Sequence, residues 1–124
     1  MEGRMATRKA YGLALRDLGE EGDFVVLDAD LSHSTMTELF AERFPRRFVN
    51  VGISEQNLLA LAAGLAYSGK IVFASTFAVF ATKAWDLLRI IAHDKLDVRV
   101  AVSHGGLSNG PDGWSHQSVE DVAV

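Results

Sequence analysis

The feature that most constrains this chain is a short apolar segment that leads through a glycine into a long helix. The segment spans 48–51, and Gly52 separates it from a helix predicted over 54–68. Ser54 has the side chain of a good N-cap, because its hydroxyl can accept a free backbone N–H of the first turn. A strand followed by a buried helix is the repeating unit of α/β proteins.

Glu55 stands in the first turn of this predicted helix, where the positive end of the helix dipole favours a carboxylate. The following residues, 58–67, are apolar almost all round, so the helix should be buried on several sides. Open α/β sheets bind their ligands beyond the carboxyl ends of their strands, which is where Glu55 falls. The residues alone leave two alternatives, a helix-stabilising side chain or part of a ligand site.

Apolar segments alternate with helical patterns along the whole chain. Predicted strands cover 23–28, 48–51, 70–75 and 98–102, and predicted helices cover 6–18, 35–44, 54–68 and 77–92, with another beginning at 118. This order predicts an α/β fold, a three-layer sandwich with a mostly parallel sheet and right-handed crossovers. The polar and aromatic residues discussed below, apart from Arg8, each follow a predicted strand. Four loops should therefore converge on one edge of the sheet.

Size, charge and cysteine content exclude several classes. A chain of 124 residues forms one domain, and a net charge of −4 argues against bulk attraction to nucleic acid or to anionic membranes. No cysteine is present, so there is no disulfide framework that would point to secretion. The longest apolar run, 58–67, is too short to span a bilayer. We therefore expect a cytoplasmic protein without nucleic-acid or membrane partners.

Three segments carry a resemblance to a known family. They are Val-Gly-Ile-Ser-Glu-Gln-Asn at 51–57, Ser-Thr-Phe-Ala-Val-Phe at 75–80, and the stretch 103–117, which ends in Asp-Gly-Trp-Ser-His-Gln. Together with Arg8 and 30–34, they resemble the pyrimidine-binding domain of transketolase-type thiamine diphosphate enzymes, most closely the carboxyl-terminal subunit of split transketolases. The resemblance covers nearly all of 1–124 and implies the thiamine diphosphate-binding fold. In the family the domain continues past this point, so we expect it to be incomplete at its carboxyl end.

The resemblance implies a cofactor site for the pyrimidine of thiamine diphosphate. Glu55 would be the catalytic carboxyl group that shares a proton with the pyrimidine ring, helped by its shielding from bulk water. Phe77 and Phe80 would form the pocket that stacks on this ring, although an aromatic pair at helical spacing is also common in protein cores. Asp30 would lie near the thiazolium side of the cofactor. Some members have a further aromatic where this chain has Lys83, so the third wall of the pocket differs here.

The resemblance also implies a site for sugar phosphate substrates. Arg8, Ser34 and His104 would bind the phosphate, a role that suits the planar guanidinium of arginine. Asp112 and His116 would bond substrate hydroxyls near the reacting carbons, and His116 would also be catalytic, because imidazole exchanges protons near neutral pH.

Simpler alternatives exist for these residues and stay open at this point. Arg8 can be a surface charge, Ser34 a helix cap and Asp112 a turn residue. His104, Asp112 and His116 can also be read as a facial metal triad. Trp114 replaces a small residue or proline of the family, and its indole is expected to narrow or cover the substrate channel.

The sequence lacks the Gly-Asp-Gly motif with a following Asn that holds Mg²⁺ and the diphosphate in this superfamily. The resemblance therefore implies only half of a cofactor site, with Mg²⁺ held by a diphosphate-binding partner subunit and no metal ligand in this chain. The implied reaction is transfer of a two-carbon ketol unit between sugar phosphates, as in the pentose phosphate pathway. A homodimer or larger homo-oligomer is expected.

Three rival interpretations remain. A 1-deoxyxylulose-5-phosphate synthase shares the Asp-Gly-x-x-His-Gln pattern, but tends to have His where this chain has Asn57. The beta subunit of 2-oxoacid dehydrogenases lacks that pattern in the corresponding loop. A non-catalytic interaction domain can keep the fold, although the presence of Glu55 and His116 argues against it.

Overall fold

Four parallel strands form the central sheet of the computed structural model, which describes residues 3–124. Met1 and Glu2, which the predicted domain included, lie outside the described residues. The spatial order is β2-β1-β3-β4. The strands are β1 (Phe24–Asp28), β2 (Phe48–Asn50), β3 (Ile71–Phe77) and β4 (Val98–Ser103). All three strand pairings are parallel, which confirms the predicted sheet.

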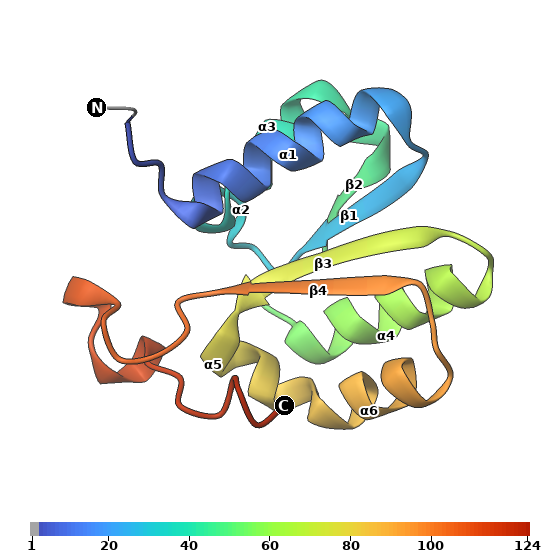
Figure 1. Cartoon of the computed structure of the whole chain (residues 1–124). Helices are drawn as coiled ribbons and strands as arrows, with labels where there is room; N and C mark the ends of the chain where they lie inside the picture. The colour runs from blue at the N-terminus through green and yellow to red at the C-terminus, as the bar shows by residue number, and fades with distance from the viewer. Residues whose placement is uncertain (1–2) are drawn as a thin grey trace.

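Helices cover both faces of this sheet and complete the predicted three layers (Figure 1). One face carries α1 (Thr7–Glu21), α2 (Ser32–Thr35) and α3 (Glu38–Arg43). The other face carries α4 (Glu55–Tyr67), α5 (Ala78–Ala81) and α6 (Trp85–His93). Short 3₁₀ turns complete the chain: η1 (Pro45–Arg47), η2 (Thr82–Ala84), η3 (Gly110–Asp112) and η4 (Trp114–His116). Among residues 3–124, no helix has both the length and the apolar character needed to cross a membrane.

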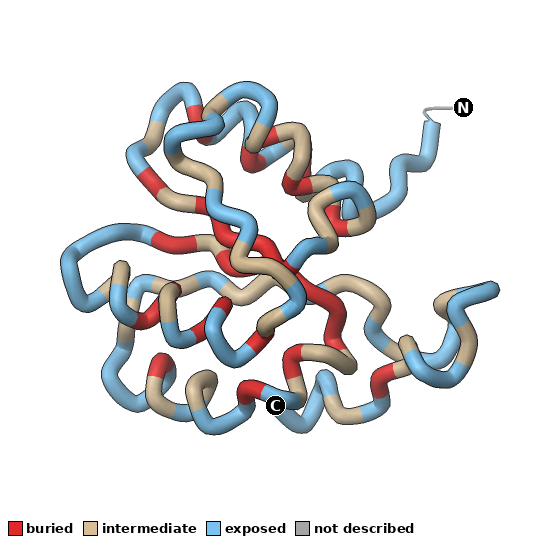
Figure 2. The backbone as a smooth tube through the Cα atoms, turned by 180° about the vertical axis from the view of Figure 1, so that it is seen from behind, coloured by how far each residue is buried: buried red, intermediate tan, exposed pale blue. Residues whose placement is uncertain are grey.

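The two faces of the sheet have separate apolar cores. On β1, Phe24 and Val26 pack with Leu15 and Phe40 on the α1 side. Leu27 belongs instead to the larger cluster under α4 and α6. This division follows from the alternation of side chains along a strand. Figure 2 shows the buried residues concentrated along the central strands.

Helix α1 is longer than predicted, because Gly19 does not end it. A Cβ at Gly19 would lie 2.4 Å from a ring carbon of Phe44, so this glycine permits close packing of α1 on the segment after α3. Arg47 donates to the carbonyl oxygens of Gly19 (2.6 Å) and Gly22 (2.5 Å), and its guanidinium lies 4.2 Å from the centroid of the Phe44 ring. The helix ends at Glu21 with Gly22 as its C-cap, and the Arg47 side chain satisfies carbonyls at this end.

Two helices that the periodicity predicted as continuous are interrupted. The predicted helix 35–44 is divided at Met36, whose φ of 65° is left-handed, and α3 starts only at Glu38. The predicted helix 77–92 is divided by η2 before α6 begins at Trp85. Apolar spacing continues through both interruptions, so the sequence pattern alone does not reveal them.

The predicted helix at 118 is wrong. Ser118 pairs with Gly106 in an antiparallel bridge, with N–H to O distances of 2.8 and 3.1 Å in the two directions. The backbone groups that would begin a helix are used in this bridge. The last residues form turns instead, which lie beside the glycine-rich loop after β4.

Candidate functional site

The candidate residues meet at the carboxyl edge of the sheet, as predicted from their places after the strands. Asp30 follows β1, Glu55 follows β2, Phe77 ends β3 and His104 follows β4, and all four strands point the same way. Asp30 and His104 have φ values of 66° and 59°. A left-handed backbone costs a non-glycine residue roughly 1–2 kcal/mol. Such strain is concentrated at functional sites in proteins.

Glu55 is a buried carboxylate at the first position of α4, with only 4% of its side chain exposed. Its Oε2 accepts a hydrogen bond from Nζ of Lys83 at 3.0 Å. The Lys83 side chain is 54% exposed, so the pair joins a buried anion to a half-exposed cation. Ser54 holds the N-cap position, but its hydroxyl makes no capping bond, contrary to the prediction.

Phe77 and Phe80 stack on one another, and the Lys83 ammonium that bonds Glu55 lies 5.1 Å from the centroid of the Phe80 ring. Their ring centroids lie 5.5 Å apart with an interplanar angle of 15°. Phe77 is buried and also stacks with the His104 imidazole, whereas Phe80 is half-buried. The His116 ring meets both phenyl rings edge-on, at centroid distances of 5.8 and 5.2 Å. The structure thus brings two cofactor candidates and two substrate candidates into one aromatic cluster.

His104 lies between this cluster and the glycine-rich loop. Its Nδ1 is 2.8 Å from the Ser103 hydroxyl, and its Nε2 is 3.5 Å from Oδ2 of Asp112. Burial lowers the pKa of His104 below its usual 6.5, the nearby Asp112 carboxylate opposes this change, and Arg8 and His116 add to it. A neutral imidazole is therefore favoured at neutral pH, able to donate one hydrogen bond and accept another.

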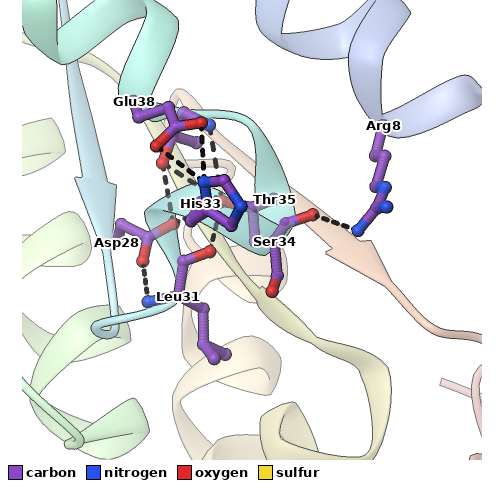
Figure 3. Close-up of polar contacts among 8 residues, drawn as sticks. Arg8, Asp28, Leu31, His33, Ser34, Thr35 and Glu38 are labelled. Carbon is purple, nitrogen blue, oxygen red and sulfur yellow. Dashed lines mark hydrogen bonds and ion pairs between the residues drawn. The ribbon is translucent and has the colours of Figure 1, made fainter. Parts of the chain in front are cut away.

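A cavity of about 860 Å³ opens between the start of α1 and the glycine-rich loop. Its lining includes Arg8, Tyr11, His104 and Asp112, and its size is in the range of small-molecule sites. Arg8 donates from Nη1 to the backbone oxygen of Ser34 at 3.4 Å, which links α1 to α2 (Figure 3). The Arg8 side chain is thereby positioned at one wall of the cavity.

Asp28, which was not predicted from the sequence as a site residue, accepts the hydrogen bonds that hold the segment after β1. It is fully buried at the end of β1 and accepts hydrogen bonds from Leu31 N (2.6 Å), Thr35 Oγ1 (2.7 Å) and Thr37 Oγ1 (2.9 Å). Figure 3 shows the bonds from Leu31 and Thr35 closing the loop around the carboxylate. Burial raises the pKa of Asp28, and the three hydrogen bonds oppose this rise. A carboxylate at the end of a buried strand was the only signal in the sequence.

Other predicted residues lie outside these contacts. Asp30 is exposed, and its Oδ1 accepts a hydrogen bond from Asn50 Nδ2 at 2.8 Å. Trp114 is 86% exposed, so its indole lies in solvent rather than over the cavity in this chain. Within residues 3–124, no three His, Asp or Glu side chains are arranged to hold a metal ion. The facial-triad alternative for the two histidines and Asp112 therefore has no geometric support.

Sequence comparison identifies the family to which this arrangement belongs. The family model for the transketolase pyrimidine binding domain matches residues 3–124. The chain belongs to this family. As a pyrimidine-binding domain it is 52% identical, over 94% of its own length, to a transketolase C-terminal section from Methanocaldococcus jannaschii. It is 44% identical to mouse transketolase over 98% of its length. The chain spans 38% of the first relative and 20% of the second.

Solved structures agree with this assignment. A split gene transketolase described as an inactive beta4 tetramer aligns with a TM-score of 0.81 at 54% identity, over 97% of this domain and 39% of that chain. Transketolase from Campylobacter jejuni aligns with a TM-score of 0.85 at 31% identity, over 96% of this domain and 20% of that chain. The chain thus has the fold of the transketolase pyrimidine-binding domain and aligns with about two fifths of a transketolase C-terminal section and of a split gene transketolase chain.

Proposed function

We propose that this chain is the pyrimidine-binding half of a thiamine diphosphate-dependent transketolase, which transfers a two-carbon ketol unit between sugar phosphates. The observation that carries the proposal is the buried Glu55 carboxylate beside the Phe77–Phe80 pair, at the edge of the sheet that also holds the two histidines. When bound, thiamine diphosphate supplies the nucleophilic carbon that breaks and forms the bond next to a ketose carbonyl.

The residues at this edge fit the pyrimidine ring of the cofactor. A base-like ring needs a flat apolar face and a hydrogen-bonding group at its rim. Phe80 is half-buried and retains accessible surface for stacking, while the buried Phe77 supports it from below the surface. Glu55, shielded from water, would share a proton with the rim of this ring. Asp30, exposed two residues after the end of β1, would face the thiazolium side.

The cavity beside α1 suits a phosphorylated sugar. Arg8 provides a charged fork for phosphate oxygens, neutral His104 in the same lining would be a further donor, and Ser34 precedes the lining residue Thr35. Asp112 and His116 lie toward the aromatic cluster, where they would bond substrate hydroxyls near the reacting carbons. His116 would also move a proton to or from the substrate.

A second subunit is part of the proposal. The chain has no sequence motif for Mg²⁺ or the diphosphate, so a diphosphate-binding transketolase subunit would hold both. Self-association is also expected, because α4 is apolar on more faces than the sheet covers, with Ala60, Gly64 and Tyr67 exposed beside its buried face. The related split gene transketolase is described as a tetramer. Light scattering that found a monomer at all concentrations would contradict this part.

The proposal is tested by ketol transfer from a ketose phosphate to an aldose phosphate, with the chain alone and with its diphosphate-binding subunit. Activity is expected only in the complex, and Glu55→Ala should lower it by about 10²–10⁴, the usual range for a general acid–base group. Hydrogen–deuterium exchange at C2 of the cofactor should slow equally in Glu55→Ala. In His116→Ala, exchange should persist while transfer falls. A complex that binds the cofactor but transfers nothing would favour a non-catalytic domain.

A further inference from the structure

Lys83 stands where the cofactor pyrimidine would have to bind. Its Nζ is 3.0 Å from Oε2 of Glu55 and 5.1 Å from the centroid of the Phe80 ring. Glu55 is the proposed partner of the pyrimidine rim, and Phe80 is the proposed stacking surface. One ammonium group thus contacts both the carboxylate and the ring that the cofactor needs.

The backbone of Lys83 is held in place, whereas its side chain can change rotamer. Gln56, in the first turn of α4, donates from Nε2 to the backbone oxygen of Lys83 at 3.0 Å, which fixes η2 to the helix that carries Glu55. The side chain is 54% exposed and has four flexible carbon atoms. The ammonium can therefore leave Glu55 for solvent without any change in the backbone.

The Lys83 ammonium and the cofactor pyrimidine would bind to the same two groups, the Glu55 carboxylate and the Phe80 ring. An ammonium donates a hydrogen bond to a carboxylate and is attracted to the face of an aromatic ring. A pyrimidine that shares a proton with Glu55 and stacks on Phe80 uses the same two surfaces. Both cannot lie on them at once, because each surface is small and Glu55 has only 4% of its area exposed.

We propose that Lys83 is a positioning residue that occupies the pyrimidine subsite in the cofactor-free protein, orients the Glu55 carboxylate, and is displaced when the cofactor binds. The inference rests on the proposed function. It makes Lys83 a competitor of the cofactor: binding must break the Lys83–Glu55 ion pair and release the ammonium into solvent.

The test compares thiamine diphosphate affinity, with Mg²⁺, of the complex containing the parent chain, Lys83→Met, Lys83→Arg or Lys70→Met. Methionine keeps the length of the stem without the charge, so Lys83→Met should bind the cofactor about two- to five-fold more tightly, the factor expected for a half-exposed ion pair. Lys83→Arg should resemble the parent. Lys70 pairs with Asp23 at the opposite edge of the sheet, so Lys70→Met is the matched control and should change nothing.

Two further readouts separate competition from a merely structural role. Salt screens a half-exposed pair, so the gap between the parent and Lys83→Met should narrow as ionic strength rises. The Nζ resonance of Lys83, identified by its loss in Lys83→Met, should shift when cofactor is added. Equal or weaker cofactor binding by Lys83→Met, or an unchanged Nζ resonance, would overturn the proposal. Failure of the proposed function looks different, since the parent complex itself would then not bind the cofactor.

Discussion

The imidazole of His104 stacks on the phenyl ring of Phe77, with ring centroids 3.8 Å apart and an interplanar angle of 24°. This contact joins the end of β3 to the residue after β4, and with it the cofactor candidates to the cavity beside α1. The same contact contributes to the burial that lowers the pKa of His104. The packing of Phe77 on His104 therefore influences the protonation of the His104 imidazole.

The depressed pKa of His104 makes a prediction about stability. Between the native pKa and 6.5, the unfolded chain binds more protons than the native one, so stability falls as pH decreases through this window and is fully present above 6.5. In His104→Asn this loss should vanish, because asparagine does not titrate and tolerates the left-handed backbone. Urea unfolding of both proteins at several pH values measures the difference, at most about 1.4 kcal/mol per pH unit. Parallel pH profiles would contradict it.

Substitution of Phe77 should mainly lower stability, whereas substitution of Phe80 should mainly lower cofactor affinity. Phe77 is 4% exposed, so Phe77→Ala is expected to lower the free energy of unfolding by about 3–5 kcal/mol. Phe80→Ala should lower it clearly less, because that ring is half-buried. Cofactor affinity of the complex should fall in Phe80→Ala by roughly 0.5–1.5 kcal/mol through lost stacking. Calorimetry showing parental affinity in Phe80→Ala would remove that ring from the pyrimidine pocket.

Asp28 should give the opposite pH dependence to His104. Its native pKa is raised, so the native chain binds more protons above the usual value of 3.8. Stability therefore falls as pH rises from about 4 through the native pKa. Asp28→Asn should remove this dependence, and the difference from the parent is read from unfolding curves at pH 4 to 7. A difference that stays constant over this range would show that Asp28 titrates as in the unfolded chain.

Two helix glycines provide a matched pair. A Cβ at Gly12 would lie 2.3 Å from the Met36 carbonyl oxygen, whereas nothing lies within 4 Å of one at Gly64. Gly12→Ala is thus expected to destabilise the chain by about 1–3 kcal/mol through overpacking. Gly64→Ala should stabilise it by up to about 1 kcal/mol, the usual gain of alanine in a helix. Thermal unfolding of the isolated chain compares them, and equal effects would mean that α1 can shift away from Met36.

Much of the fold was predictable because it depends on local pattern. Short apolar segments alternating with helical periodicity predicted four parallel strands and three layers, and all four strands are present. Interruptions were not predictable. Met36 turns left-handed and η2 breaks a helix although the apolar spacing runs on, and Ser118 pairs with Gly106 rather than starting a helix.

For the site, the sequence by itself determined which chemical groups reach the carboxyl edge of the sheet, since each follows a strand and all strands point one way. Only the tertiary structure decided which side chains these groups contact. Lys83 bonds Glu55, 28 positions away in the sequence, and Asp28 accepts hydrogen bonds from Thr35 at the end of α2 and from Thr37 before α3. Such contacts depend on where folded segments come to rest in space. Periodicity reports the face on which a side chain lies, but not the side chain that it meets there.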